Sequence, residues 1–386
     1  MAEPATILRN PLRSADGVAS PERPRPEVLG FHRKLPGYEP TPLVFAPALA
    51  ASLGLDALLI KDESSRLGLP AFKMLGASWA TYRALVERLG HEPPEWTDVG
   101  QLAERLAPLG PLRLDAATDG NHGRAVARMA ALLGYDASIF VPAGTVAARI
   151  DSIAGEGADV TVVPGTYDDA VAASAALASD SAIVISDTSW PGYAEVPRRV
   201  IEGYTTIFAE VDEQLASTDL GRWPDVVAVQ MGVGALTAAV VDHVDGLRTR
   251  PVVVAVEPER AACGLRSAEA GQLVAVPGPH ESIMAGLNCG TPSEVAWPSV
   301  SAGVDVFVAV QDAAAEQAMR DLDSLGIEAG ETGAAGLAGL RALVDAGGAD
   351  PSLGTARSAL VICTEGPTDP VAYERIVGHS PAFSTQ

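Results

Sequence analysis

Cysteine is scarce in this chain of 386 residues, which contains Cys263, Cys289 and Cys363 alone. Three cysteines so far apart suit neither a disulfide-rich scaffold nor a CxxC metal site. We therefore expect no metal, and a reducing, cytoplasmic setting.

Positive charge is also scarce: 27 Lys and Arg residues stand against 49 Asp and Glu residues, which gives a net charge of −22. A chain of this charge repels phosphate backbones and anionic lipid surfaces. The composition therefore predicts no nucleic-acid partner.

Long apolar runs are missing. The most apolar stretch, Val226 to Val241, is interrupted by one glutamine and two glycines and is too short for a bilayer. The N-terminus carries Glu3 where a signal peptide needs an apolar core. We expect neither a membrane span nor secretion.

What the sequence does contain is an alternation of β-branched runs with Ala- and Leu-rich stretches, which is typical of βα units around parallel sheets. We expect strands at Ala57–Lys61, Leu112–Ala116, Ser138–Val141, Val160–Val163, Ala182–Ile185, Val226–Val229, Val252–Val256, Val306–Val310 and Ala359–Ile362. We expect helices at Phe72–Leu89, His122–Leu133, Val146–Gly155, Tyr167–Ala178, Ala194–Val211, Leu236–Val244, Ala313–Leu325 and Ala334–Val344. So many strands favour an α/β fold with two open, mostly parallel twisted sheets covered by helices. Early prolines predict an irregular N-terminal arm over residues 1–40.

A lysine among apolar residues is the first candidate for chemistry. Lys73 lies in LPAFKMLGASWA, at the expected start of a helix. Desolvation there favours the neutral amine that a carbonyl needs to form an imine. A surface lysine whose stem covers apolar area is the alternative.

Two polar turns follow expected strands and open helices. In Thr118-Asp119-Gly120-Asn121-His122-Gly123, backbone donors and the helix dipole could hold a carboxylate or phosphate, although simple helix capping is the commoner use. In Gln230-Met231-Gly232-Val233-Gly234-Ala235-Leu236, glycines let backbone N–H groups approach a phosphate. The second loop lacks the rest of a dinucleotide or triphosphate motif, so a single phosphate is the expected guest.

Two further strand ends carry polar groups. Asp187, in Ser186-Asp187-Thr188-Ser189-Trp190, could face a cleft at the carboxyl edge of a sheet. Cys363 and Thr364 end the last expected strand and offer a thiol and a hydroxyl at a similar edge. An ordinary loop and a buried apolar cysteine are the alternatives.

The order of these motifs resembles that of the fold type II pyridoxal 5′-phosphate enzymes, which share the architecture of the tryptophan synthase β-subunit. Within them the sequence is similar to the diaminopropionate ammonia-lyase family. The resemblance rests on KDESSRLGLPAFKMLG, ATDGNHGRAVA, DTSWPGYAEVPRRVIEGY, QMGVGAL, SIMAGLNCG, GETGAAG and TEGPTDP, and spans about Lys61 to Asp369. It implies a large cofactor-binding domain over residues 41–83 and 198–386, and a small mobile domain over residues 84–197.

The resemblance also implies roles in cofactor binding. Lys73, next to Phe72, is similar to the Schiff-base lysine, and Asn121 to the asparagine beside the 3′-oxygen of the cofactor. The loop from Gly232 through Val233, Gly234 and Ala235 to Leu236 is similar to the phosphate cradle. Cys363 stands near the expected pyridine nitrogen, with Thr364 adjacent. Cys263 and Cys289 lie where some relatives pair cysteines, although a cytoplasmic protein more often keeps thiols.

Asp119 is the most specific feature of the resemblance, because relatives that act on serine or threonine usually carry serine there. The family assigns Asp119 and Asp187 as bases for D- and L-2,3-diaminopropionate. Thr118, Gly120 and Thr188 complete the expected substrate site. The implied reaction is an α,β-elimination that gives pyruvate and two ammonia, by an enzyme that is usually a homodimer. A serine, threonine or hydroxyaspartate dehydratase, or a non-catalytic cofactor or amino-acid binding protein, remains the alternative.

Overall fold

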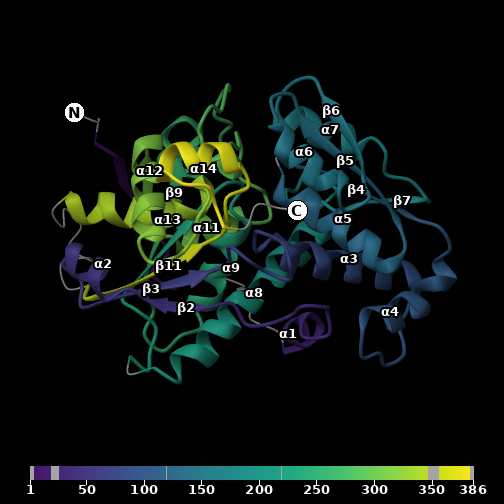
Figure 1. Ribbon diagram of the computed structural model, residues 1–386, viewed down its shortest axis with the longest axis horizontal. Helices are drawn as coiled ribbons and strands as arrows, with labels where there is room; N and C mark the ends of the chain where they lie inside the picture. The colour runs from purple at the N-terminus through teal and green to yellow at the C-terminus, as the bar shows by residue number, and fades with distance from the viewer. Residues whose placement is uncertain (1–3, 19–25, 119, 219, 347–355, 383–386) are drawn as a thin grey trace.

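The computed structural model describes residues 4–18, 26–118, 120–218, 220–346 and 356–382. Its strands form two separate sheets (Figure 1). The seven-stranded sheet has the order β1 (Thr6–Arg9), β10 (Val306–Val310), β9 (Val252–Pro258), β8 (Val226–Gln230), β11 (Ser358–Cys363), β3 (Ala57–Asp62) and β2 (Leu43–Phe45). The four-stranded sheet has the order β6 (Asp159–Val163), β5 (Asp136–Pro142), β4 (Arg113–Ala117) and β7 (Ala182–Val184).

Pairing in both sheets is largely parallel. All pairs of the four-stranded sheet are parallel, and only the edge strands β1 and β2 of the larger sheet are antiparallel to their neighbours. The expected α/β class with two mostly parallel sheets is therefore confirmed. All of the expected strands are present, each within about two residues of its predicted ends.

Helices connect the strands and cover the sheets. They are α1 (Pro26–His32), α2 (Pro47–Ser52), α3 (Lys73–Leu89), α4 (Val99–Leu106), α5 (Asn121–Leu133), α6 (Ala147–Ala154), α7 (Tyr167–Ala175), α8 (Glu195–Leu215), α9 (Ala235–Val244), α10 (Cys263–Ala270), α11 (Trp297–Gly303), α12 (Asp312–Asp323), α13 (Glu331–Asp345) and α14 (Pro370–Val377). Among the described residues, no helix has the length and apolar composition that a membrane span requires.

The larger sheet is buried on both faces. On β10, Phe307 and Ala309 face a core that also contains α3, α8 and α9, whereas Val306 and Val308 face a second core with α12 and α13. Strand alternation sends successive side chains to opposite faces, so both faces must be apolar when helices cover both.

The prediction of an irregular arm over residues 1–40 is wrong in two places. Thr6–Arg9 forms β1, which pairs with β10, and Pro26–His32 forms α1. The prolines do not prevent either element, because Pro4 and Pro11 flank β1 and Pro26 is the first residue of α1, where the missing N–H has no helical partner to lose.

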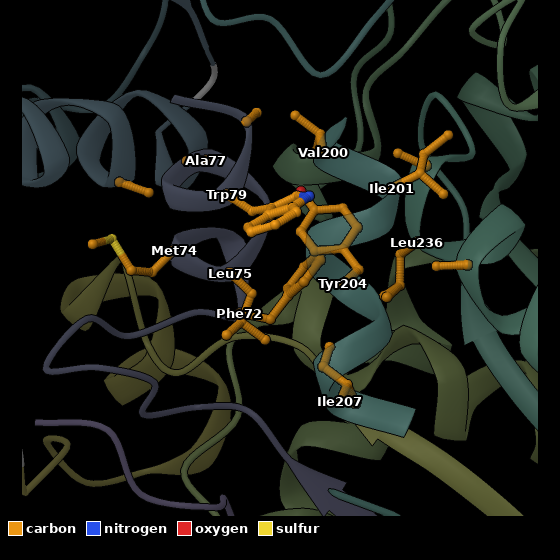
Figure 2. Packing of buried hydrophobic residues seen from close by; sticks show 14 of the residues in the cluster. Phe72, Met74, Leu75, Ala77, Trp79, Val200, Ile201, Tyr204, Ile207 and Leu236 are labelled. Carbon is orange, nitrogen blue, oxygen red and sulfur yellow. The ribbon is translucent and has the colours of Figure 1, made fainter. Parts of the chain in front are cut away.

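The two helices α3 and α8 pack closely against each other (Figure 2), in a core that also contains residues of both sheets. A Cβ on Gly76 would lie 2.5 Å from a ring carbon of Tyr204, and a Cβ on Gly203 would lie 2.5 Å from the Leu75 carbonyl oxygen. The same carbonyl accepts a hydrogen bond from Nε2 of buried His32, at 2.9 Å. Burial lowers the pKa of His32 to about 3, so its ring is neutral at pH 7. These contacts fix the first turn of α3, which carries Lys73.

Candidate active site

One cavity gathers residues from both sheets. The larger sheet contributes the loop between β8 and α9 and the residues that follow β11, while the smaller sheet contributes residues that follow β4 and β7. Helix α3 adds Phe72 and Lys73. Open parallel sheets bind ligands at the carboxyl ends of their strands, and this cavity lies at such ends in both sheets.

Lys73 and Asp187 form an ion pair inside this cavity. The Lys73 Nζ lies 2.7 Å from the Asp187 Oδ2, and the Asp187 side chain is 7% exposed. The sequence predicted apolar neighbours for Lys73, and the Phe72 ring does lie 5.4 Å from its Nζ. Its carboxylate partner Asp187 follows β7 of the four-stranded sheet, and the sequence did not predict this contact.

Asp187 is held in its ionised form. Burial alone would raise its pKa, but the Lys73 ammonium, nearby His122 and the Tyr167 hydroxyl together hold the pKa well below its usual range. The Tyr167 hydroxyl donates to Asp187 Oδ1 at 3.1 Å. Tyr167 is the first residue of α7, and the sequence offered no motif that singled it out.

The polar turn before α5 is partly described. Asn121 begins α5, and its Nδ2 donates to Glu365 Oε2. His122 is buried, and its Nε2 lies 2.8 Å from the Ile185 carbonyl oxygen, next to the loop that carries Asp187. Asp119 lies outside the described residues, so its predicted role stays a prediction. Glu365 lines the cavity and was not predicted, although TEGPTDP pointed to this segment.

The glycine loop fits an anion. Gly232, Val233, Gly234, Ala235 and Leu236 all line the cavity, and α9 begins there with Gly234 as its N-cap at φ 96°. A Cβ on Gly232 would lie 3.0 Å from the Gly286 carbonyl oxygen, so a side chain would fill this space. Backbone donors and the positive end of the α9 dipole converge here, as a phosphate group requires.

The side chains of Cys363 and Thr364, at the end of β11, lie in different surroundings. Thr364 lines the cavity and its Oγ1 accepts a hydrogen bond of 2.9 Å from Gln230 Nε2. Cys363 faces the second core, where burial raises its thiol pKa well above the ordinary value. Of this pair, Thr364 therefore presents its side chain to the cavity.

The other predicted site residues are spread more widely. Thr118 lines the cavity, whereas Gly120 lines a small neighbouring recess that also contains Arg149 and Thr368. Thr188 belongs to neither set, and its backbone N–H donates to Ser186 Oγ at 3.2 Å. Cys263 and Cys289 are buried, and no disulfide joins them in this structure.

The donor set fits pyridoxal 5′-phosphate. A cavity-facing amine at Lys73, a glycine loop shaped for a phosphate, and the hydroxyl of Thr364 match the aldehyde, phosphate and ring nitrogen of that molecule in chemistry. Phe72 and Leu287 add apolar walls for a ring.

Comparisons with known proteins agree with this chemistry. The family model described as "Pyridoxal-phosphate dependent enzyme" matches residues 34–364. The diaminopropionate ammonia-lyase of Salmonella typhimurium is 36% identical over 375 residues, covering 91% of each chain. The enzyme of that name from Escherichia coli is 36% identical over 360 residues, covering 90% of this chain and 89% of its own.

Solved structures give the same result. The Escherichia coli diaminopropionate ammonia lyase in complex with D-serine matches with a TM-score of 0.87 at 33% identity, covering 97% of this chain and 96% of that one. The same enzyme in complex with an aminoacrylate-PLP azomethine reaction intermediate matches with a TM-score of 0.86, covering 97% of each chain. A tomato threonine deaminase at 20% identity, with a TM-score of 0.71, shares the fold.

Proposed function

Because the chain belongs to the pyridoxal-phosphate dependent enzyme family, we propose that it catalyses the diaminopropionate ammonia-lyase reaction. In this reaction 2,3-diaminopropionate and water give pyruvate and two ammonia. The observation that carries the proposal is the Lys73–Asp187 ion pair in a cavity that the glycine loop Gly232–Leu236 also lines. Its substrate is an amino acid, in keeping with the relatives.

The chain's own residues divide the work between binding and proton transfer. The loop Gly232–Leu236 would hold the phosphate of the cofactor, and Lys73 would provide the amine for its aldehyde. When bound, the cofactor supplies a ring that accepts the electrons left when the α-proton is removed. The ionised Asp187 accepts that proton at Oδ2, the oxygen that faces Lys73, while Tyr167 holds Oδ1.

Two acids would serve the two substrate isomers. We assign Asp187 to L-2,3-diaminopropionate and Asp119 to the D isomer, as the sequence resemblance implies. A base on each face of a planar group can remove either α-proton, whereas one base reaches only one face.

The cavity charge favours a substrate with a second amino group. Asp187 and Glu365 both line it, and both are nearly fully buried. A buried carboxylate attracts the β-ammonium of diaminopropionate, which serine and threonine lack. This is the physical ground for preferring diaminopropionate over the amino acids of the dehydratases.

The remaining features of the proposal concern the whole molecule. Residues 84–197 would act as a small domain that closes over the site and keeps water from the reacting carbon. We propose a homodimer, as is usual in the family, and a cytoplasmic location, which is supported by the three free cysteines.

An amino-acid panel tests the function. Protein loaded with pyridoxal 5′-phosphate should release pyruvate and ammonia from at least one isomer of 2,3-diaminopropionate, and faster than from serine, threonine or 3-hydroxyaspartate. Lys73→Ala, which lacks the proposed cofactor-binding amine, is the inactive control. No pyruvate from either isomer would reject the proposal, and faster release from a hydroxyamino acid would favour a dehydratase.

A further inference from the structure

The loop that carries Asp187 is attached at both ends. On its near side, the Tyr193 hydroxyl donates to the Val184 carbonyl at 2.6 Å and accepts from the Ser186 backbone N–H at 3.1 Å. This contact ties the loop to its own four-stranded sheet. Trp190 stacks on the Tyr193 ring, with centroids 4.1 Å apart and planes 8° apart.

On its far side the loop crosses to the other half of the molecule. The hydroxyls of Ser189 and Ser293 lie 2.8 Å apart, and the Ser189 backbone N–H donates to Ser293 Oγ at 3.2 Å. The Val295 backbone N–H in turn donates to Ser189 Oγ at 3.1 Å. Ser293 is 1% exposed, so these polar contacts are shielded from water.

Ser293 also contacts the phosphate cradle. Its backbone N–H donates to the Val233 carbonyl at 2.9 Å, and Val233 is the second residue of the glycine loop Gly232–Leu236. A continuous path of hydrogen bonds therefore runs from Val233 through Ser293 to Ser189, two residues from Asp187.

We propose that the Ser189–Ser293 hydroxyl pair is a positioning device that couples the phosphate cradle to the acid Asp187. The ion pair with Lys73 can hold Asp187 only while the amine is free and charged. The hydroxyl pair does not involve Lys73. It therefore keeps the Asp187 carboxylate in place when the Lys73 amine is no longer free and charged. The proposal rests on the proposed function for the role of Asp187, but not for the coupling itself.

Hydrogen–deuterium exchange tests the coupling without any substrate. Loading wild-type protein with pyridoxal 5′-phosphate should slow exchange in both the cradle, residues 231–236, and the acid loop, residues 186–193. In Ser189→Ala and Ser293→Ala the cradle should still be protected, while most of the protection of the acid loop is lost. Equal protection of both segments in both variants would overturn the proposal.

Kinetics provide the second measurement. Ser189→Ala should lower kcat for the isomer deprotonated by Asp187 by about tenfold, because both hydrogen bonds of the Ser189 hydroxyl are lost, and leave KM within about twofold. The other isomer should be affected less. Ser189→Thr, which keeps the hydroxyl on a half-buried residue, should restore most of the rate.

Ser301→Ala is the matched control, because Ser301 follows in the same part of the chain and its hydroxyl contacts only the nearby Pro298 carbonyl among the described residues. It should behave as wild type. If wild-type protein releases no pyruvate at all, the proposed function fails, and the exchange experiment still decides the coupling. Wild-type kinetics in both alanine variants, with an unchanged isomer ratio, would show that the pair does not position Asp187.

Discussion

The two sheets are built from the same βα units but are buried to different depths. Strands β8, β10 and β11 of the larger sheet are buried at every residue, whereas β6 of the smaller sheet has no fully buried residue and exposes 51% of Val162. Helix α6 buries only Ile153. The edge strand β6 and helix α6 therefore bury less apolar surface than the central strands of the larger sheet, and we expect this side of the molecule to cost less to move.

The site is divided along the same line. The proposed cofactor-binding groups, Lys73 and the glycine loop, lie with the larger sheet, and the proposed acid Asp187 follows β7 of the smaller one. A deep base that holds the cofactor and a thin layer that brings the acid suit an enzyme that must admit substrate and then exclude water.

The largest expected effect tests this division of labour. Lys73→Ala should abolish covalent cofactor binding and lower activity at least a thousandfold, since a group that acts covalently has no substitute. Asp187→Asn should keep the cofactor yet lower kcat for L-2,3-diaminopropionate by about a hundredfold or more, because the proposed proton acceptor for that isomer is lost. Absorbance of the bound cofactor and pyruvate release measure the two effects. Loss of the cofactor in Asp187→Asn would contradict the separation between cofactor-binding groups and the acid.

Stability should follow burial. Val254→Ala in β9, at 0% exposure, should lower the free energy of unfolding by about 2 kcal/mol, because it removes buried methyl groups and leaves a cavity. Val162→Ala in β6 should lower it by less than about 0.5 kcal/mol. Urea denaturation of the two variants measures both. Equal losses of unfolding free energy in the two variants would contradict the difference in burial between these two strands.

One contribution to the pH dependence of stability comes from α13, which packs on the larger sheet. Burial, with help from Glu365, raises the pKa of Glu331 on α13 to about 7. The folded protein therefore binds more protons here than the unfolded chain between about pH 4.5 and 7, so Glu331 lowers the stability as the pH rises through that window. At about pH 8, Glu331→Gln should be more stable than wild type by about 1–2 kcal/mol.

The control for this comparison is Glu104→Gln, at an exposed position of α4 in the smaller part of the chain. Urea denaturation of protein without cofactor, at acidic and alkaline pH, measures the free energy of unfolding. The difference in this free energy between Glu104→Gln and wild type should be the same at both pH values. A Glu331→Gln variant that loses stability at alkaline pH would contradict the raised pKa.

The smallest effect concerns a contact between the two parts. Both Nε and Nη2 of Arg149 on α6 donate to Thr368 Oγ1, at 3.3 and 3.2 Å. Thr368→Ala should favour the open form slightly and raise KM about two- to threefold with kcat unchanged, as expected for the loss of two long, partly exposed hydrogen bonds to one hydroxyl. Steady-state kinetics check this. A tenfold fall in kcat would mean that Arg149 does more than close the site.

Much of the fold followed from residue patterns, because buried parallel strands are continuous apolar runs. Strands β1 and β2 escaped prediction since they are short antiparallel edges that carry partly exposed residues. In the site, Lys73, Asp187 and the glycine loop were predicted, as each follows a strand or opens a helix. Tyr167 and Glu365 were not, because their roles arise from contacts with residues that are distant in the chain, at a separation of 20 residues for Tyr167 and Asp187 and 244 for Glu365 and Asn121.

The close crossing of α3 and α8 sets a limit on changes in chain length. Each residue of an α-helix turns the chain by about 100°. One residue inserted between Lys73 and Gly76 would keep the crossing in place and swing the amine about a quarter-turn or more around the helix, out of reach of Asp187. Insertions after Gly90, where α3 has ended and a left-handed glycine opens an exposed loop, leave that register untouched. Natural relatives and engineered variants should therefore differ in length at the far end of α3 and hardly ever at its beginning.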